Sequence, residues 1–575
     1  MAKLILLLIF MLPNLLLDAQ VVGTHASGAR QKTFFEQAFT IGGANEERSR
    51  RIITLSDGGY LIVGGTQSDG AGDFDALLVK LKPNGQIDWA KTIGGTDWDY
   101  FKGAIEAGGA IYAYGETYSG DAGGGDAFIA KLNLTTGAII WDRVIGGSAD
   151  YDQFYDAAEA GDGNIVFAGQ TYSDGAGGAD AFIVKVNAST GAIIWDRTVG
   201  GSNDEWISGI VKTADDGFVL VGDTYSDGAG DEDAFVFKIN SSGTVQWDKT
   251  LGGASYDWFE RAVVVDDGNV IIAGNTWSIG QGLGDALVVK INPSTGAIIW
   301  SKVMGGSNEE WEEHITKTRD GNVVISGGAE VCGSWWEGHV FKLDQSDGSL
   351  IWSRIAGDCD NNNGVDSWFQ AHTETSDGGI LAFGDVWYYG AGDQDFYVVK
   401  MSPKGNIPGG HQWVENDTYG STIANATGLT YANADTADTE ANADTADTEA
   451  NADSADTEAA ATDADSVFYV VGPAPFSFTD QTNVALSSTI NSNILQITGL
   501  KHPAQMWIQN GNYRICSDAA CSSEVQTWTS SNRILIYNNQ YLQIRRTSAG
   551  TNNTASTVSI WVGATKDVWS ITTLP

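Results

Sequence analysis

The stretch DAFIAKLNLTTGAIIWDRVIGG, residues 126–147, holds two short apolar runs separated by the turn Thr136-Gly137. It recurs almost unchanged as DAFIVKVNASTGAIIWDRTVGG at residues 180–201. Turn-forming residues bound each run, and β-branched or aromatic residues fill it, which is typical of β-strands. The stretch therefore predicts two neighbouring strands that the chain uses repeatedly.

The repeat extends well beyond these two copies, with a period of 52–54 residues. Three markers show it: a glycine after an apolar residue, a tryptophan, and a lysine that closes an apolar run. The glycines are Gly42, Gly94, Gly146, Gly200, Gly252 and Gly305. The tryptophans are Trp89, Trp141, Trp195, Trp247, Trp300 and Trp352, and the lysines are Lys80, Lys131, Lys185, Lys238, Lys290, Lys342 and Lys400. A fixed period of this length indicates a solenoid or a propeller.

Each repeat reads as four strands, here called A to D. In the second repeat they are Phe101–Glu106, Ala110–Thr117, Asp126–Leu132 and Ala138–Val144. Four strands in about 50 residues, repeated seven times, predict an all-β protein with a seven-bladed β-propeller over residues 32–408.

The ends of the repeat region predict how the ring closes. The seventh repeat has no tryptophan-bearing strand D after Lys400, while Lys32–Ile41 is an isolated strand in the register of strand D. We therefore expect this N-terminal strand to complete the seventh blade.

Two resemblances follow from these motifs. The segments Ser68–Ala76 and Lys80 resemble the repeats of secreted propeller proteins of bacterial and archaeal surfaces, most of which have no assigned function. The hexapeptide Thr136–Trp141 is similar to the tryptophan-docking motif of quinoprotein propellers, which typically have eight shorter blades. With seven longer blades, the motif is expected to mark blade packing rather than a quinone site.

The rest of the chain changes character. Residues 409–466 form a linker with three near-identical acidic nonapeptides at 432–458, which lack large apolar residues and are expected to be a disordered, self-repelling spacer. Residues 467–575 alternate again and predict a β-sandwich. Their opening, Phe476–Asp480 with Asn483–Ser487, resembles accessory Ig-like modules of bacterial surface proteins, which commonly space or attach rather than catalyse.

Charge and the N-terminus bear on location and partners. The formal net charge is −41, and the sequence has no basic stripe, which argues against nucleic-acid binding. Residues 1–19 are interpreted as a signal peptide, with a basic start, the apolar run Leu4–Leu17 and a cleavage site at Ala19. No later run is long and apolar enough to span a membrane. These features predict a secreted or cell-surface protein with no membrane span in its mature chain.

Four cysteines suit an oxidising compartment. Cys516 and Cys521 lie close in sequence and are expected to pair. Cys332 and Cys359 fall on two irregular loops of neighbouring repeats, and a disulfide between them would rigidify both loops.

One face of the predicted ring is chemically richer than the other. The D-to-A loops carry acid–aromatic pairs such as Asp257-Trp258 and Glu310-Trp311, and the B-to-C loops begin with aromatic residues such as Tyr225 and Trp277. Aromatic rings stack on sugars and carboxylates accept hydrogen bonds from hydroxyl groups, so this face fits a glycan site. The alternative is that these residues recur because they pack blade against blade.

Departures from the repeat single out candidate ligand-binding residues. The sixth and seventh repeats carry enlarged, irregular loops on this face. The candidates are Trp311, Trp335, Trp336, Glu337, Asp360, Asp366 and Trp368. The alternative is that these loops belong to a blade that has diverged in sequence and that a Cys332–Cys359 disulfide stabilises it.

Calcium is the one cofactor that the sequence suggests, as a structural ion. Two Gly-rich B-to-C loops hold several aspartates, and oxygen-rich loops suit Ca²⁺. The candidate ligands are Asp69, Asp73, Asp75, Asp227, Asp231 and Asp233. The EF-hand spacing is absent, and aspartates also cap turns without any metal.

The sequence thus favours a secreted, non-catalytic recognition protein that binds an extracellular carbohydrate or protein on the D-to-A and B-to-C loop face. One alternative is an extracellular carbohydrate-active enzyme, a hydrolase or lyase, that uses acids of that face. Another is a structural surface scaffold with no ligand. No histidine pair, nucleophile elbow or phosphate-binding loop adds an enzymatic signature.

Overall fold

The computed structural model describes most of the repeat region and of the C-terminal region. The described residues are 39–42, 45–71, 73–119, 124–147, 151–280, 282–330, 336–356, 367–387, 394–406, 422–425, 430–432, 439–441, 457–460, 468–469, 476–498, 504–530, 534–536, 539–562 and 565–574. The predicted signal peptide lies outside them. Within the described residues, no helix has the length and apolar character needed to cross a membrane.

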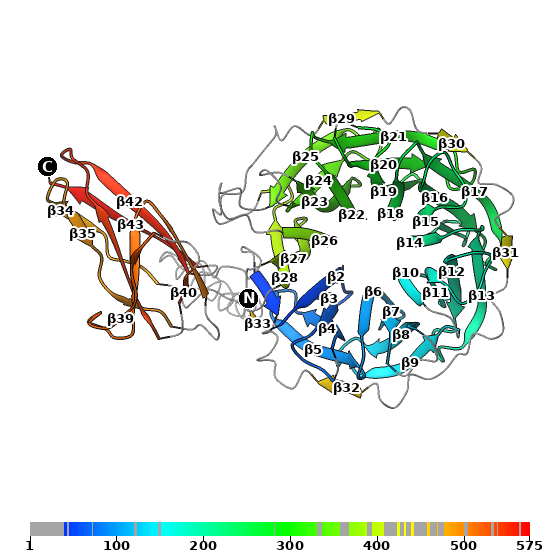
Figure 1. The fold of residues 1–575 in the computed structure, drawn as a ribbon, viewed down its shortest axis with the longest axis horizontal. Coiled ribbons are helices and arrows are strands. Elements are labelled where there is room, and N and C mark those ends of the chain that lie inside the picture. The colour runs from blue at the N-terminus through cyan, green and yellow to red at the C-terminus, as the bar shows by residue number, and fades with distance from the viewer. Residues whose placement is uncertain are drawn as a thin grey trace, which may run out of the picture.

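Seven antiparallel sheets form a ring, as Figure 1 shows. Blade 1 contains β2 (Glu47–Thr54), β3 (Tyr60–Thr66), β4 (Asp75–Leu81) and β5 (Ile87–Gly94). Blade 2 contains β6 (Asp99–Ala107), β7 (Ala110–Thr117), β8 (Asp126–Asn133) and β9 (Ile139–Ile145). Blade 3 contains β10 (Asp152–Glu159), β11 (Ile165–Thr171), β12 (Asp180–Val186) and β13 (Ile193–Gly200). Blade 4 contains β14 (Glu205–Lys212), β15 (Phe218–Thr224), β16 (Asp233–Ile239) and β17 (Val245–Gly252).

The remaining blades repeat this order. Blade 5 contains β18 (Asp257–Val264), β19 (Val270–Thr276), β20 (Asp285–Ile291) and β21 (Ile298–Gly305). Blade 6 contains β22 (Glu310–Lys317), β23 (Val323–Glu330), β24 (Trp336–Leu343) and β25 (Leu350–Ala356). Blade 7 contains β26 (Ser367–Glu374), β27 (Ile380–Trp387), β28 (Gln394–Met401) and β1 (Phe39–Gly42). The all-β, seven-bladed prediction is confirmed.

The N-terminal strand closes the ring as expected. β1 pairs antiparallel with β28, and Ile41 lies opposite Phe396 in this register. Ile41 is fully buried and belongs to the apolar cluster between blades 7 and 1. Residues 32–38 of the predicted strand lie outside the described residues.

The repeated tryptophan packs one blade onto the next. Trp141 of blade 2 covers Gly191 in the C-to-D turn of blade 3, where an added Cβ would lie 2.9 Å from the indole ring. The same contact joins Trp195 to Gly243. Gly191 also has a φ of +74°, so no other residue suits the site well. The tryptophan motif therefore serves blade packing, as the sequence indicated.

The repeated lysine binds the A-to-B turn of its own blade. The Nζ atom of Lys80 lies 2.6 Å from a carboxylate oxygen of Asp57, and Lys400 is 2.7 Å from Asp377. Blade 2 has Gly108-Gly109 in this turn, and there the Lys131 ammonium donates to the Ala188 carbonyl of blade 3 instead. Each lysine thus ties the end of strand C to a neighbouring turn.

The acidic linker differs from the prediction. Four of its segments are strands on the outer edges of blades: β29 (Thr422–Asn425), β30 (Thr430–Ala432), β31 (Thr439–Ala441) and β32 (Thr457–Ala460). A fifth such strand, β33 (Phe468–Tyr469), lies in the region 467–575 that was expected to form the sandwich. They pair with blades 5, 4, 3, 1 and 7 in that order, and Figure 1 shows β29–β32 on the outer rim. Within the nonapeptides at 432–458, where a disordered spacer was expected, β31 and the first two residues of β32 are strands. They need no core, because the free main-chain groups of an outer edge strand supply their partners.

The C-terminal region is a two-layer sandwich. One sheet has the order β34 (Gln481–Val484), β43 (Thr565–Thr573), β42 (Ala555–Val562), β37 (Ala504–Gln509) and β40 (Ile534–Ile536). The other has the order β35 (Thr489–Asn491), β41 (Tyr541–Thr547), β38 (Asn512–Cys516) and β39 (Glu524–Thr529), with β36 (Leu495–Gln496) also on β41. Buried side chains from both sheets, including Trp569 and Tyr513, form one core. The predicted Cys516–Cys521 disulfide is present. The Ig-like assignment stays a prediction.

Candidate functional site

The innermost strands of the seven blades line the centre of the ring (Figure 1). In five of these strands the second and fourth side chains are partly exposed while the first and third are buried, so the second and fourth face the central channel; in β6 and β10 the second residue has the same place in the strand but is buried. The residue at the second position of each innermost strand belongs to a layer that we call the first channel ring: Arg48, Tyr100, Gln153, Trp206, Trp258, Trp311 and Trp368. The residue at the fourth position of each of these strands belongs to the next layer, the second channel ring: Arg50, Lys102, Tyr155, Ser208, Glu260, Glu313 and Gln370.

A β-bulge interrupts every innermost strand at the second channel ring. In β2 the register shifts between Ser49 and Arg51, and in β22 between Glu312 and His314. A bulge sets two residues against one on the partner strand, so the residue after it is also redirected. Arg51 and His314, which follow the bulge, line a pocket at the other end of the channel. The bulge therefore adds a further layer of polar side chains.

Tryptophans of the first channel ring form a continuous arc across blades 5 to 7. Trp258 and Trp311 have ring centroids 5.0 Å apart, and Trp311 and Trp368 are 5.9 Å apart. Trp336, from strand C of blade 6, lies 4.7 Å from Trp368. We call these four residues the tryptophan arc. The indole nitrogens of Trp311 and Trp368 have no hydrogen-bond partner.

Two carboxyl groups lie directly below the arc. Trp258 donates its indole hydrogen to Glu260 over 2.9 Å. Burial raises the pKa of Glu260 to about 8, and repulsion from Glu313 adds to this shift. Burial also raises the pKa of Glu313 to about 7, although the Arg50 and Arg261 guanidinium groups oppose it. Near neutral pH both groups therefore hold protons for much of the time and can donate as well as accept hydrogen bonds.

The opposite side of the second channel ring is cationic. Lys102 lies 2.9 Å from Glu116 and 5.2 Å from the centre of the Tyr100 ring. The Arg50 guanidinium lies 5.1 Å from the same ring. The channel thus has bases in blades 1 and 2 and acids with tryptophans in blades 5 and 6. The repeat itself does not produce this asymmetry.

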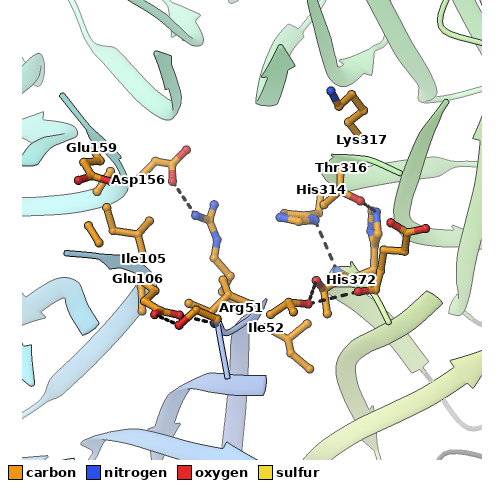
Figure 2. Close-up of a pocket in the computed structure, with 18 of the residues that line it drawn as sticks. Arg51, Ile52, Ile105, Glu106, Asp156, Glu159, His314, Thr316, Lys317 and His372 are labelled. Carbon is orange, nitrogen blue, oxygen red and sulfur yellow. Dashed lines mark hydrogen bonds and ion pairs between the residues drawn. The ribbon is translucent and has the colours of Figure 1, made fainter. Parts of the chain in front are cut away.

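A pocket of about 710 Å³ opens at the A-to-B turn end of the channel (Figure 2). On one side of it Arg51 bonds Asp156 over 2.6 Å, and Tyr114 donates to the same carboxylate oxygen over 3.1 Å. Burial alone would raise the pKa of Asp156, but Arg51 and Arg261 outweigh it and hold that pKa below its usual value. Asp156 is therefore a buried anion between two cations.

Two histidines face this ion pair across the pocket, as Figure 2 shows. Their rings lie 5.0 Å apart, nearly perpendicular. His372 makes hydrogen bonds with Thr316 at 2.8 Å and with Ser326 at 2.7 Å. Burial lowers the pKa of His372 to about 3 and, together with repulsion from His372, lowers that of His314 well below its usual value. Both rings are neutral at physiological pH, so the two histidines offer hydrogen bonds without carrying charge.

The structure separates the ligand-binding residues expected from the sequence. It brings Trp311, Trp336 and Trp368 together in the arc. Glu337 is fully buried and accepts a hydrogen bond from Ser367, so it does not face a ligand. The remaining candidates fall outside the described residues: Trp335, Asp360, Asp366, Cys332 and Cys359.

The six aspartates expected to bind calcium have different surroundings. Asp75 and Asp233 are buried and accept backbone hydrogen bonds from Ala71 and Ala229 of their own loops. In the same way, Asp69 and Asp227 cap the N–H groups of the glycines that follow them. The last two, Asp73 and Asp231, are exposed. Among the described residues, no group of three or more histidine, cysteine or acidic side chains is placed to hold a metal.

Calcium therefore stays a prediction with a direct test. If these loops bind Ca²⁺ as a structural ion, adding EDTA to the full chain should lower the melting temperature of the propeller by several degrees, and excess CaCl₂ should restore it. MgCl₂ at the same concentration is the control, because Mg²⁺ fits loops of this size poorly. A melting temperature that EDTA does not change would exclude this role.

The charged residues of the second channel ring were not identified as candidates from the sequence. Arg50, Lys102, Glu260 and Glu313 all occupy the fourth position of strand A. Aligning the repeats on the residue that starts strand A and comparing this position would have shown bases in two repeats and acids in two others. The sequence signal was present, but the bulge that directs these residues inward was not recognisable.

The chain has limited similarity to known proteins. The model of the family described as outer membrane protein assembly factor BamB matches residues 125–397, which is just under half of the chain. A tetrathionate hydrolase of Acidithiobacillus ferrooxidans is 27% identical over 158 residues, covering 27% of this chain and 29% of the hydrolase. The chain therefore aligns with less than a third of that relative's length.

Solved structures are more distant. A quinohemoprotein alcohol dehydrogenase of Pseudomonas putida HK5 is 10% identical, with a TM-score of 0.33, over 64% of this chain and 69% of the dehydrogenase. An endo-1,5-alpha-L-arabinanase of Thermotoga petrophila RKU-1 is 11% identical, with a TM-score of 0.24, over 64% of this chain and 98% of the arabinanase. These similarities are too low to carry an argument about activity.

Proposed function

We propose that this chain is a secreted, non-catalytic recognition protein that binds a carbohydrate at the end of the channel formed by the tryptophan arc. The observation that carries the proposal is the arc itself: contiguous, partly exposed indole rings set above Glu260 and Glu313. Indole faces stack on the apolar faces of sugar rings, while the carboxyl groups can bond hydroxyls.

A secreted setting is supported by the chemistry of the chain. The Cys516–Cys521 disulfide fits an oxidising compartment, and a net charge of −41 disfavours anionic partners such as nucleic acids. A neutral, hydroxyl-rich ligand avoids the repulsion that this charge imposes. A protein ligand on the same face is the other partner class that the loops could accept.

The first test measures carbohydrate binding by the full chain. Oligosaccharide arrays would identify a ligand, and calorimetry would compare the wild type with Trp311→Ala. For Trp311→Ala we expect affinity to fall by about tenfold or more. Loss of one stacked ring should weaken the binding free energy by about 1.4 kcal/mol. Trp528→Ala is the control, because Trp528 lies in β39 of the C-terminal sandwich and not in the propeller. An equal effect of both variants, or no binding to any carbohydrate, would contradict the proposal.

A carbohydrate-active enzyme is the second candidate, and the Glu260–Glu313 pair favours it. Glycoside hydrolysis needs two carboxyl groups, one protonated and one ionised. Here burial raises the pKa of both, which favours hydrogen bonding over nucleophilic attack near neutral pH. Release of reducing ends from a bound polysaccharide, abolished in Glu260→Gln, would establish the enzyme instead.

A further inference from the structure

The pocket at the A-to-B turn end of the channel has no part in the carbohydrate proposal, which concerns the opposite end. It measures about 710 Å³, and all of its lining residues belong to the described part of the chain. Binding sites for small molecules commonly measure about 300–1,000 Å³. The pocket therefore has the size of a second binding site.

Two hydrogen-bond donors, Arg51 and His314, lie on facing sides of this pocket and form what we call its floor (Figure 2). The bonds from Arg51 to Asp156 and Tyr114 both use Nη1. A guanidinium has five N–H groups, so Nη2 and Nε keep donors for a ligand. The Nδ1 atom of His314 accepts the main-chain hydrogen of His372 over 3.4 Å, so a neutral ring carries its own hydrogen on Nε2. The floor thus offers one cationic and one neutral donor.

The charges around the floor favour an anion. Arg51 and Arg261 place two positive charges around the single negative charge of Asp156. The carboxyl groups of the second channel ring compensate only in part: burial raises the pKa of Glu260 to about 8 and that of Glu313 to about 7, so both hold protons for much of the time near neutral pH. A bound carboxylate would balance the positive charge that these five groups leave.

The walls of the pocket differ in polarity. Ile53 of β2 and Ile105 of β6 line the pocket and are partly exposed. On blade 6 the Thr316 hydroxyl also lines it, but this hydroxyl is already bonded to His372 over 2.8 Å. Exposed apolar side chains gain free energy when an apolar ligand group removes them from water. The wall on blades 1 and 2 therefore suits a hydrocarbon tail.

The mouth of the pocket carries both signs of charge and selects for neither. Glu106 accepts the main-chain hydrogen of Ser56 over 2.6 Å, and Lys317 lies 2.7 Å from Asp266. Solvent screens exposed charges of this kind, so they contribute little to the affinity for a ligand. Selectivity therefore depends on the floor and on the apolar wall.

We propose that this pocket binds a small carboxylic acid with a short hydrocarbon tail. The carboxylate accepts hydrogen bonds from Arg51 and His314, and the tail lies against Ile53 and Ile105. Hydrogen bonds between a guanidinium and a carboxylate are stronger than those between neutral groups, so the floor fixes the orientation of the ligand. A neutral sugar lacks this charge, which distinguishes this ligand from that of the tryptophan arc.

Butyrate and butyramide provide the first test, with the full chain. The two probes share a tail and a shape, but only butyrate is charged at neutral pH. Saturation-transfer difference NMR would follow the methyl protons of each probe during a titration. We expect butyrate to bind at least about tenfold more tightly than butyramide, because the amide cannot make charge-assisted hydrogen bonds as an acceptor. Equal binding of the two probes, or no saturable signal from butyrate, would overturn the proposal.

Two variants test whether the butyrate signal comes from this pocket. His314→Phe keeps an aromatic ring but removes the Nε2 donor, so we expect the affinity for butyrate to fall by about tenfold. Glu159→Gln is the matched control, because Glu159 lines the same pocket as an exposed residue and does not belong to the floor. This control should change the affinity by less than about twofold. Losses of similar size in the two variants would contradict the assignment.

Ile105→Glu keeps the proposal testable if His314→Phe does not fold. Ile105 is partly exposed, so a carboxylate is tolerated there and repels a bound anion. We expect the affinity for butyrate to fall by at least about tenfold, with a melting temperature within a few degrees of the wild type. Unchanged butyrate binding in this variant would refute the proposal. None of these outcomes bears on the carbohydrate site, which has a different ligand at the other end of the channel.

Discussion

Replacing Asp156 by alanine is expected to lower the free energy of unfolding of the propeller by about 3–5 kcal/mol. The carboxylate of Asp156 lies 2.6 Å from Arg51 and also lowers the electrostatic cost of burying Arg261. Without it, two buried guanidinium groups would face each other with no anion between them. Urea denaturation of the full chain, followed by tryptophan fluorescence, would measure the loss.

The matched control separates an unpaired charge from a lost contact. In Arg51→Met/Asp156→Leu both members of the pair become apolar, so the variant should lose clearly less stability than the sum of the two single changes. Additive losses, or a loss below about 1 kcal/mol for Asp156→Ala, would show that the pair is not effectively buried in solution.

Thermal stability is expected to fall as the pH rises from about 5 to 9. Burial raises the pKa of Glu260 to about 8 and that of Glu313 to about 7, against an ordinary value of 4.5. Over this range the folded state keeps protons that the unfolded chain releases, so deprotonation favours unfolding. After allowance for relaxation, the pair contributes about 3 kcal/mol, or roughly 5 °C in melting temperature.

Calorimetry of Glu260→Gln/Glu313→Gln would isolate this contribution. Glutamine keeps the shape and cannot ionise, so the variant should melt at a temperature that depends less on pH. The slope should not vanish, because burial also raises the pKa of Asp180 to about 7 and of Glu310 to about 8. Identical pH profiles for the variant and the wild type would contradict the raised pKa values.

Much of the fold could be predicted because every repeat carries the same short-range sequence signals. The turn at Thr136-Gly137 and the alternating apolar runs around it define strands, and Trp141 and Gly191 meet because each recurs at a fixed offset. The missing strand D after Lys400 also predicted closure by the N-terminal strand. These features depend on short-range patterns that every repeat shares.

The candidate site was only partly predictable. The aromatic residues Trp311, Trp336 and Trp368 were recognised, but their grouping with Trp258 arises from three blades that meet at the ring centre. Glu337 had the right chemistry, yet its position in strand C buries it completely. Residue type alone could not distinguish a buried acid from one that faces the channel.

The sequence by itself determined the number of blades, the strands within them and the way the ring closes, because these follow from period, turn residues and alternation. Only the tertiary structure decided which side chains share the channel and where the acidic repeats lie. A bulge redirects Arg51 and His314, and free main-chain groups on the outer edges pair with Thr-x-Ala segments that have no apolar pattern of their own. Both effects depend on backbone geometry between distant residues, which side-chain patterns do not encode.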